Sequence, residues 1–120
     1  MVPGVYNITI YRGGTFEIDF YAEDDDGPIS LGEIYDQADL IIYDAWVTPT
    51  EVNLPTPLME LSTTSGEIII SGTQLRIHLP AAITEAISFV GGTYRLKLTI
   101  TDELNPVVDP FMQGTVTIRN

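Results

Sequence analysis

Hydrophobic and polar residues alternate in several short segments of this chain, a pattern that predicts β-strands. The clearest segment runs from residue 93 to residue 101, and its apolar positions are Tyr94, Leu96, Leu98 and Ile100. Turn-forming residues follow, and the alternation resumes between Phe111 and Ile118. This pair of strands has one polar face and one apolar face, so we expect the apolar face to pack on a second layer. The connection from Asp102 to Pro110 is a candidate contact loop.

The same alternation predicts further strands, separated by glycine-rich or acidic turns. These strands are Tyr6–Tyr11, Thr15–Tyr21, Asp39–Trp46, Leu58–Leu61, Glu67–Ser71 and Gln74–Leu79. The side chains expected to face the core are Phe16, Ile18, Phe20, Leu40, Ile42, Leu75, Ile77 and Leu79. About seven or eight short strands with frequent turns predict a β-sandwich that forms a single domain over residues 1–120.

One short helical crossover is expected, over residues 81–89. Pro80 suits a first helical turn, and Gly91 or Gly92 is expected to end the helix. The segment from Ile29 to Ala38 has helix-like spacing interrupted by Gly32, so we expect an irregular crossover there. The segment 48–57 contains three prolines and is expected to be an extended surface loop.

Composition and charge restrict the classes of function. An apolar fraction of 44% with 18% charged residues is typical of a globular domain. Seventeen acidic and five basic residues give a net charge of −12, which would repel a phosphate backbone. We therefore expect no direct binding of nucleic acid. The chain has no cysteine, which excludes disulfides, thiolate nucleophiles and cysteine-ligated metals.

The first residues, Met1 to Gly4, contain no basic region of the kind that begins a signal peptide, and no apolar run follows them. The apolar stretches are only a few residues long, which is too short to cross a bilayer. From these features we expect a soluble acidic protein that is intracellular when synthesised and does not bind a membrane.

Three features resemble an immunoglobulin-like sandwich. A short helical crossover precedes the sequence Gly-Gly-Thr-Tyr that ends at Tyr94, and Tyr94 lies two residues before the inward-facing Leu96. In immunoglobulin domains a corner tyrosine precedes the second core cysteine by two residues. The resemblance implies that Leu96 and Ile18 occupy the two cysteine positions, and that Trp46 lies on the strand between them.

A second resemblance covers almost the whole chain. Its motifs are Tyr-x-Ile-x-Ile-Tyr-x-Gly-Gly-Thr-Phe at 6–16, Asp-Asp-Gly-Pro-Ile at 25–29, Thr-Thr-Ser-Gly at 63–66, Gly-Gly-Thr-Tyr-Arg-Leu-Lys-Leu at 91–98 and Gly-Thr-Val-Thr-Ile at 114–118. The combination is similar to a family of small virion proteins of tailed bacteriophages, and to tail or baseplate N-terminal domains. The resemblance implies a structural protein that docks fibres, plugs joints or decorates capsids.

The acidic segment Asp24–Asp26 raises the question of a calcium site. Asp24, Asp26, Gly27 and Glu33 match four positions of the helix-loop-helix calcium motif. The first ligand position would be Ala22, which offers no side-chain oxygen. Acidic residues are also typical of solvated turns. We predict a turn here, and no metal or cofactor in the chain.

Catalytic chemistry has little support in the sequence. His78 is the only histidine, lies on the polar side of a predicted strand, and is accompanied by no Gly-x-Ser-x-Gly motif. We predict an exposed strand histidine, no catalytic residues and no enzyme. Paired carboxylates for glycoside chemistry stay open, because any two of the seventeen acidic residues could meet. A small hydrolase is therefore the third hypothesis.

Residues that suit an interface are aromatic or lie in the proline-rich loop. They are Tyr6, Tyr11, Trp46, Pro49, Pro55 and Pro57. The alternative is that several of the aromatic residues fill the core. The strand Tyr6–Tyr11 could also pair with another subunit through its backbone.

The leading hypothesis is a non-enzymatic phage structural protein, assembled in the host cytoplasm and carried in the virion. Its partners would be tail, baseplate, portal or capsid proteins, to which it attaches as an adaptor or as a capsid-decorating cement subunit. We expect a homo-oligomer, with a trimer as one option, because many copies make weak contacts sufficient. The alternative is a β-sandwich that binds a carbohydrate or a receptor, with calcium at Asp24–Asp26 in one version.

Overall fold

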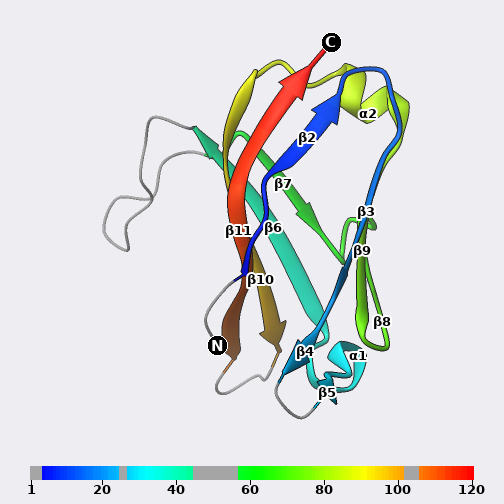
Figure 1. The fold of residues 1–120 in the computed structure, drawn as a ribbon, viewed down its shortest axis with the longest axis vertical. Helices are drawn as coiled ribbons and strands as arrows, with labels where there is room; N and C mark the ends of the chain where they lie inside the picture. The colour runs from blue at the N-terminus through cyan, green and yellow to red at the C-terminus, as the bar shows by residue number, and fades with distance from the viewer. Residues whose placement is uncertain (1–3, 25–26, 45–56, 102–105) are drawn as a thin grey trace.

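The computed structural model describes residues 4–24, 27–44, 57–101 and 106–120, in which two main sheets face each other (Figure 1). The larger sheet has the order β1-β11-β10-β6-β7, with β2 also paired to β11. Its strands are β1 (Gly4–Val5), β2 (Ile8–Tyr11), β6 (Gln37–Asp44), β7 (Met59–Ser62), β10 (Gly91–Ile100) and β11 (Val107–Arg119). The smaller sheet has the order β3-β9-β8, with strands β3 (Phe16–Tyr21), β8 (Ile68–Ser71) and β9 (Gln74–Leu79).

Four short elements complete the described fold. Strands β4 (Glu23–Asp24) and β5 (Gly27–Pro28) form a separate antiparallel pair. Helices α1 (Leu31–Ile34) and α2 (Ala81–Glu85) make only about one turn each. The prediction of an all-β protein with two packed sheets is therefore confirmed.

The core lies between the two sheets and consists of the apolar faces that the alternation predicted. Leu96 and Leu98 on β10 are fully buried, as are Leu75 and Leu79 on β9. Leu40, Ile42, Phe20 and Ile77 are buried as expected, while Phe16 and Ile18 are partly buried against the same cluster. The period of two thus identified the inward face of β3, β6, β9 and β10 correctly.

Strand β1 and strand β2 pair with β11 in one continuous parallel register, in which Gly4 lies opposite Met112 and Ile8 opposite Val116. Between them the Tyr6 amide donates to the Gln113 carbonyl at 2.9 Å, and two side-chain hydrogen bonds add to this contact. The Tyr94 hydroxyl donates to the Tyr6 carbonyl at 2.6 Å, and the Thr115 amide donates to Asn7 Oδ1 at 3.1 Å. The predicted corner role of Tyr94 is wrong, because its hydroxyl donates to the carbonyl of Tyr6, between β1 and β2, and not to backbone a few residues upstream.

The connection between β10 and β11 is shorter than predicted, because residues 107–110 belong to β11. The register shifts there: Leu96 lies opposite Met112 and Lys97 opposite Pro110, which leaves Phe111 as an extra residue. Such a β-bulge tolerates proline, which has no amide hydrogen to donate to the ladder. Phe111 is buried and packs edge-to-face on Phe20, with ring centroids 6.4 Å apart.

Helix α2 ends at Glu85, so the prediction of a helix to residue 89, closed by a glycine, is wrong. Thr84 is fully buried, and its hydroxyl oxygen lies 2.7 Å from the Gly14 carbonyl oxygen and 3.0 Å from that of Ala81, so the hydroxyl can donate to either. Gly91 and Gly92 open β10 and form no turn. A Cβ atom on Gly92 would overlap the Tyr43 carbonyl oxygen, which explains the glycine at this position.

The prediction of a single helix is also wrong. The segment 29–38, expected to be irregular, contains α1 and the first residues of β6. Leu31 is fully buried and fixes α1 to the core, and the Tyr35 amide donates to the Leu31 carbonyl at 2.8 Å. Burial of one side chain thus holds a helical turn that Gly32 alone would disfavour.

Candidate interaction surfaces

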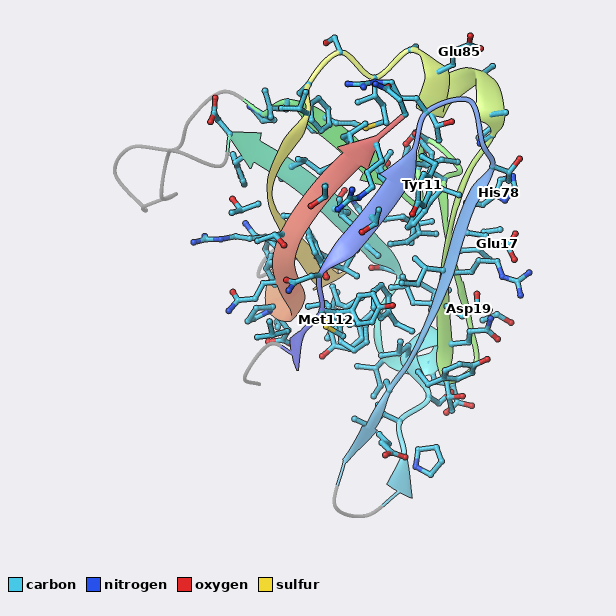
Figure 2. The ribbon with its side chains drawn as sticks, turned by 45° about the horizontal axis from the view of Figure 1, so that its top comes forward. Tyr11, Glu17, Asp19, His78, Glu85 and Met112 are labelled. Atoms are coloured by element: carbon cyan, nitrogen blue, oxygen red, sulfur yellow. The ribbon has the colours of Figure 1, made fainter. Side chains whose placement is uncertain are left out.

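Of the predicted interface residues, Tyr6, Tyr11 and Pro57 lie in the described part of the chain; Trp46, Pro49 and Pro55 lie outside it. The structure does not bring Tyr6 and Tyr11 together. Tyr6 is 49% exposed and packs edge-to-face on Phe20 at 5.6 Å, toward the core side. Tyr11 is 58% exposed at the other end of β2 and is labelled in Figure 2. Tyr6 therefore fits both alternatives: its side chain is half exposed, as an interface residue would be, and its ring packs on the core.

Pro57 adjoins a small apolar groove. The groove has a volume of about 210 Å³ and lies between the start of β7 and the segment that follows α2. Its lining residues include Leu58, Ile83 and Phe89. Leu58 and Ile83 are both exposed. An apolar ligand or segment would fit this groove, but no described contact indicates which.

The outer face of the larger sheet carries a polar hollow of about 550 Å³. Strands β6, β7, β10 and β11 line it, and its charged residues are Asp39, Glu60 and Lys97. The Gln37 side-chain amide lies 3.1–3.2 Å from both Asp39 carboxylate oxygens and donates to them. Hydroxyls and charges of both signs suit a polar ligand.

Strand β3 forms one edge of the smaller sheet, and its outward side chains include the charged Glu17 and Asp19. Arg76 on β9 donates from Nε to Asp19 Oδ1 at 2.8 Å, and the same Nε lies 3.5 Å from Glu17 Oε1. His78 Nδ1 lies 3.1 Å from Glu17 Oε2. Figure 2 shows Glu17, Asp19 and His78 along this outer side. His78 thus lies on the polar side of a strand, as predicted, with its side chain 44% exposed and beside the Glu17 carboxylate.

The hydrogen bond from Arg76 is the main cause that lowers the pKa of Asp19 below its usual value. Asp19 therefore stays ionised at any pH near neutrality. The β3 edge consequently keeps its negative charge under ordinary conditions.

Strand β8 forms the other edge of the smaller sheet and has no charged residue between Ile68 and Ser71. Ile69 points outward and is 53% exposed. The connection to β9 turns at Gly72, whose φ of 59° is the positive angle that the first central residue of a type II′ hairpin requires. The sequence predicted this strand and this turn, but it gave no sign that β8 would be an edge.

A pair of contacts joins the segment after α1 to the larger sheet. The Tyr35 hydroxyl donates to Asp109 Oδ2 at 2.7 Å, and Asp36 accepts from the Thr101 amide and hydroxyl. Burial, together with the bond to Asp109, raises the pKa of Tyr35 to about 12. Hydrogen bonds from Thr101 lower the pKa of Asp36. These groups fix the crossover and offer no acid or base near neutral pH.

The acidic segment predicted as a turn is only partly described. Asp24 lies opposite Gly27 in the β4–β5 pair, so the chain reverses direction between these strands; residues 25–26 lie outside the described part. Gly27 has a φ of 117°, which only glycine adopts easily. Among the described residues, no group of three or more His, Cys, Asp or Glu is arranged to hold a metal.

In the described part of the chain, no helix has the length and apolar character that a membrane span requires. No protein-family model matches the chain, and no curated protein matches it significantly.

Proposed function

We propose that this chain is a non-enzymatic docking module built on an immunoglobulin-like β-sandwich. The strand order supports the fold assignment: β3-β9-β8 corresponds to strands B-E-D, and β11-β10-β6-β7 to strands G-F-C-C′ of a variable-type domain. The first strand departs from the constant-type order, because β1 and β2 pair with β11 and not with β3. Leu96, in one cysteine position, is fully buried, and Ile18, in the other, packs on the same core.

The observation that carries the docking proposal is the uncharged edge strand β8. An edge strand presents unpaired amides and carbonyls, and proteins normally protect such an edge with charges, prolines or a covering segment. Strand β3, on the other side of the same sheet, has this protection in Glu17 and Asp19. Strand β8 has an exposed isoleucine instead. Addition of a strand from another protein is a common mode of docking at such an edge.

The virion setting is supported by the sequence resemblance that runs from Tyr6 to Ile118. In this proposal many copies attach to tail, baseplate, portal or capsid proteins, and each contact can be weak because the copies act together. The net charge of −12 suits a protein that must not adhere to packaged DNA.

Mass spectrometry of purified phage particles tests the virion setting. The chain should be found among the virion proteins, and its absence from the particles would contradict this part of the proposal. Complementation with an Ile69→Lys variant tests the edge itself. We expect particles that lack the variant but retain a Tyr21→Lys control, since Tyr21 is 68% exposed on the opposite edge. Equal incorporation of both variants would exclude β8 as the docking edge.

The polar hollow on the outer face of the larger sheet supports a second candidate, the binding of a carbohydrate or receptor. Asp39, Glu60 and Lys97 could hydrogen-bond sugar hydroxyls. A glycan array repeated with and without a chelator tests this candidate and its calcium-dependent version. Any binding should be lost in Lys97→Ala and retained in Gln113→Ala, a residue of the same face outside the hollow. A flat array under both conditions would remove the candidate.

A further inference from the structure

The unpaired backbone groups of β8 can be assigned to particular residues. In an antiparallel pair, residues that exchange hydrogen bonds alternate with residues that do not. The His78 amide donates to the Glu67 carbonyl at 2.8 Å, so Glu67 is bonded toward β9. By alternation Ile69 and Ser71 are also bonded toward β9. The amides and carbonyls of Ile68 and Ile70 therefore point away from the sheet.

Gly72 supports this assignment and limits the free edge. Its carbonyl belongs to the same outward series, and it accepts a hydrogen bond from the Gly32 amide at 3.1 Å. Helix α1 thus occupies the edge beyond Ser71. Within the described part of the chain, the outward groups of Ile68 and Ile70 have no such partner. The free edge is short, with two residues that each offer one donor and one acceptor.

We propose that this edge pairs with the same edge of a second copy, antiparallel, about a two-fold axis at Ile69. This partner assignment rests on the docking role proposed for β8. In that register Ile68 faces Ile70 of the second copy, and Ile70 faces its Ile68. Every outward group then has a partner, and four backbone hydrogen bonds join the copies. The free edge is its own complement, which is the requirement for a two-fold interface.

The side chains favour the same register. Ile69 would meet Ile69 of the second copy as a non-hydrogen-bonded pair, the geometry in which cross-strand side chains approach most closely. Glu67 would face Ser71 of the second copy, so the two Glu67 carboxylates are not opposed. A chain with a net charge of −12 repels its own copies over most of its surface. Between Ile68 and Ser71, strand β8 itself adds no charge to this repulsion.

The contact is small, and we expect a weak dimer that gains strength when copies are held together on a larger assembly. Buried area alone would not hold such a pair in dilute solution, because association costs translational and rotational freedom. Detection therefore needs a method that traps the pair in its register.

Disulfide trapping suits this chain, because it has no cysteine of its own. Under mild oxidation the Ile69→Cys variant should form a covalent dimer about tenfold faster than Tyr21→Cys, since pairing raises the effective thiol concentration. Tyr21 is a stringent control because it is the more exposed residue, at 68% against 53% for Ile69. A mixture of Glu67→Cys and Ser71→Cys should form mixed dimers faster than either variant alone.

Equal rates for Ile69→Cys and Tyr21→Cys would overturn the self-pairing. Mixed dimers that form no faster than the single-variant dimers would overturn the register. Circular dichroism of each reduced variant verifies that it folds. If trapping fails but Ile69→Lys is still lost from particles, the docking role survives with a different partner. If trapping succeeds and the chain is absent from particles, self-pairing stands and the virion setting fails.

Discussion

The two edges of the smaller sheet differ in the side chains that accompany their unpaired backbone groups. Both β3 and β8 pair with β9, and both leave a row of backbone groups without a strand partner in the described part of the chain. On β3 the outward residues include Glu17 and Asp19, held by Arg76. On β8 the outward side chain at the corresponding place is Ile69. A single sheet thus has one edge protected by charges and one edge without them, and the proposed docking uses the second.

The largest effect is expected from Leu75→Ala, which should destabilise β3 and β8 together because the residue lies between them on β9. Leu75 is fully buried and lies opposite Phe20 on β3 and Ile70 on β8. Loss of the side chain should lower the free energy of unfolding by about 2–5 kcal/mol, because it leaves a cavity in the core. Urea denaturation measures this. The control Ile69→Ala should cost well under half as much, and equal costs would show that Ile69 is a core residue.

The second largest effect is expected when the two charges that protect the β3 edge are removed. In the Glu17→Thr, Asp19→Thr double variant, threonine keeps the β propensity while the two charges are lost. We expect this variant to self-associate at concentrations where the parent chain is monomeric, because β3 then resembles β8. Sedimentation velocity over a concentration series measures the change. Unchanged sedimentation would show that something other than these carboxylates protects β3.

The third prediction concerns a substitution that adds a protecting charge to the β8 edge. Ile69→Lys places a charge at the centre of the open edge and should abolish self-association at all accessible concentrations. Its stability should stay within about 0.5 kcal/mol of the parent, because the substitution is on the surface. Concentration-dependent amide shifts in NMR spectra measure the association. Shifts at β8 that persist in Ile69→Lys would contradict the role of this residue.

The smallest effect concerns the acid sensitivity of β3. The pKa of Asp19 is lower in the folded than in the unfolded chain, because Arg76 donates to its carboxylate. This contribution to stability is present above the unfolded pKa of about 3.8 and is lost as the pH falls through the lower, folded value. Titration followed by NMR should show the pKa of Asp19 rise toward 3.8 in Arg76→Gln. An unchanged value would assign the shift to another group.

The sequence was most informative about the faces of strands. Alternation identified the buried residues of β9 and β10, and glycines at positions 66 and 72 marked turns in which both adopt positive φ. It was least informative where a distant segment decides the outcome. Thr84 lies among polar helix residues, and nothing near it in the sequence marks it as buried, but its hydroxyl donates to the Gly14 carbonyl, seventy positions away. Pro110 suggested a loop, and a bulge in β11 accommodates it within a strand.

The sequence was also a poor guide to the candidate interface, which depends on how the strands are ordered. Tyrosines and prolines were selected because their side chains suit interfaces, and this criterion favoured Tyr6, whose ring packs on Phe20. Strand β8 was predicted as a strand with its bounds nearly correct, yet nothing in its residues distinguished it from a central strand. A run of isoleucines is equally typical of both.

By itself, the sequence determined the all-β class, the inward face of most strands and the acidic character of the surface. It could do so because side-chain polarity records burial directly, one residue at a time. Only the tertiary structure decided which strands lie at the edges and which groups they leave unpaired. Strand pairing uses backbone amides and carbonyls that are the same at nearly every position, so the local sequence does not specify the partner. The contrast between β3 and β8 exists only once β9 lies between them.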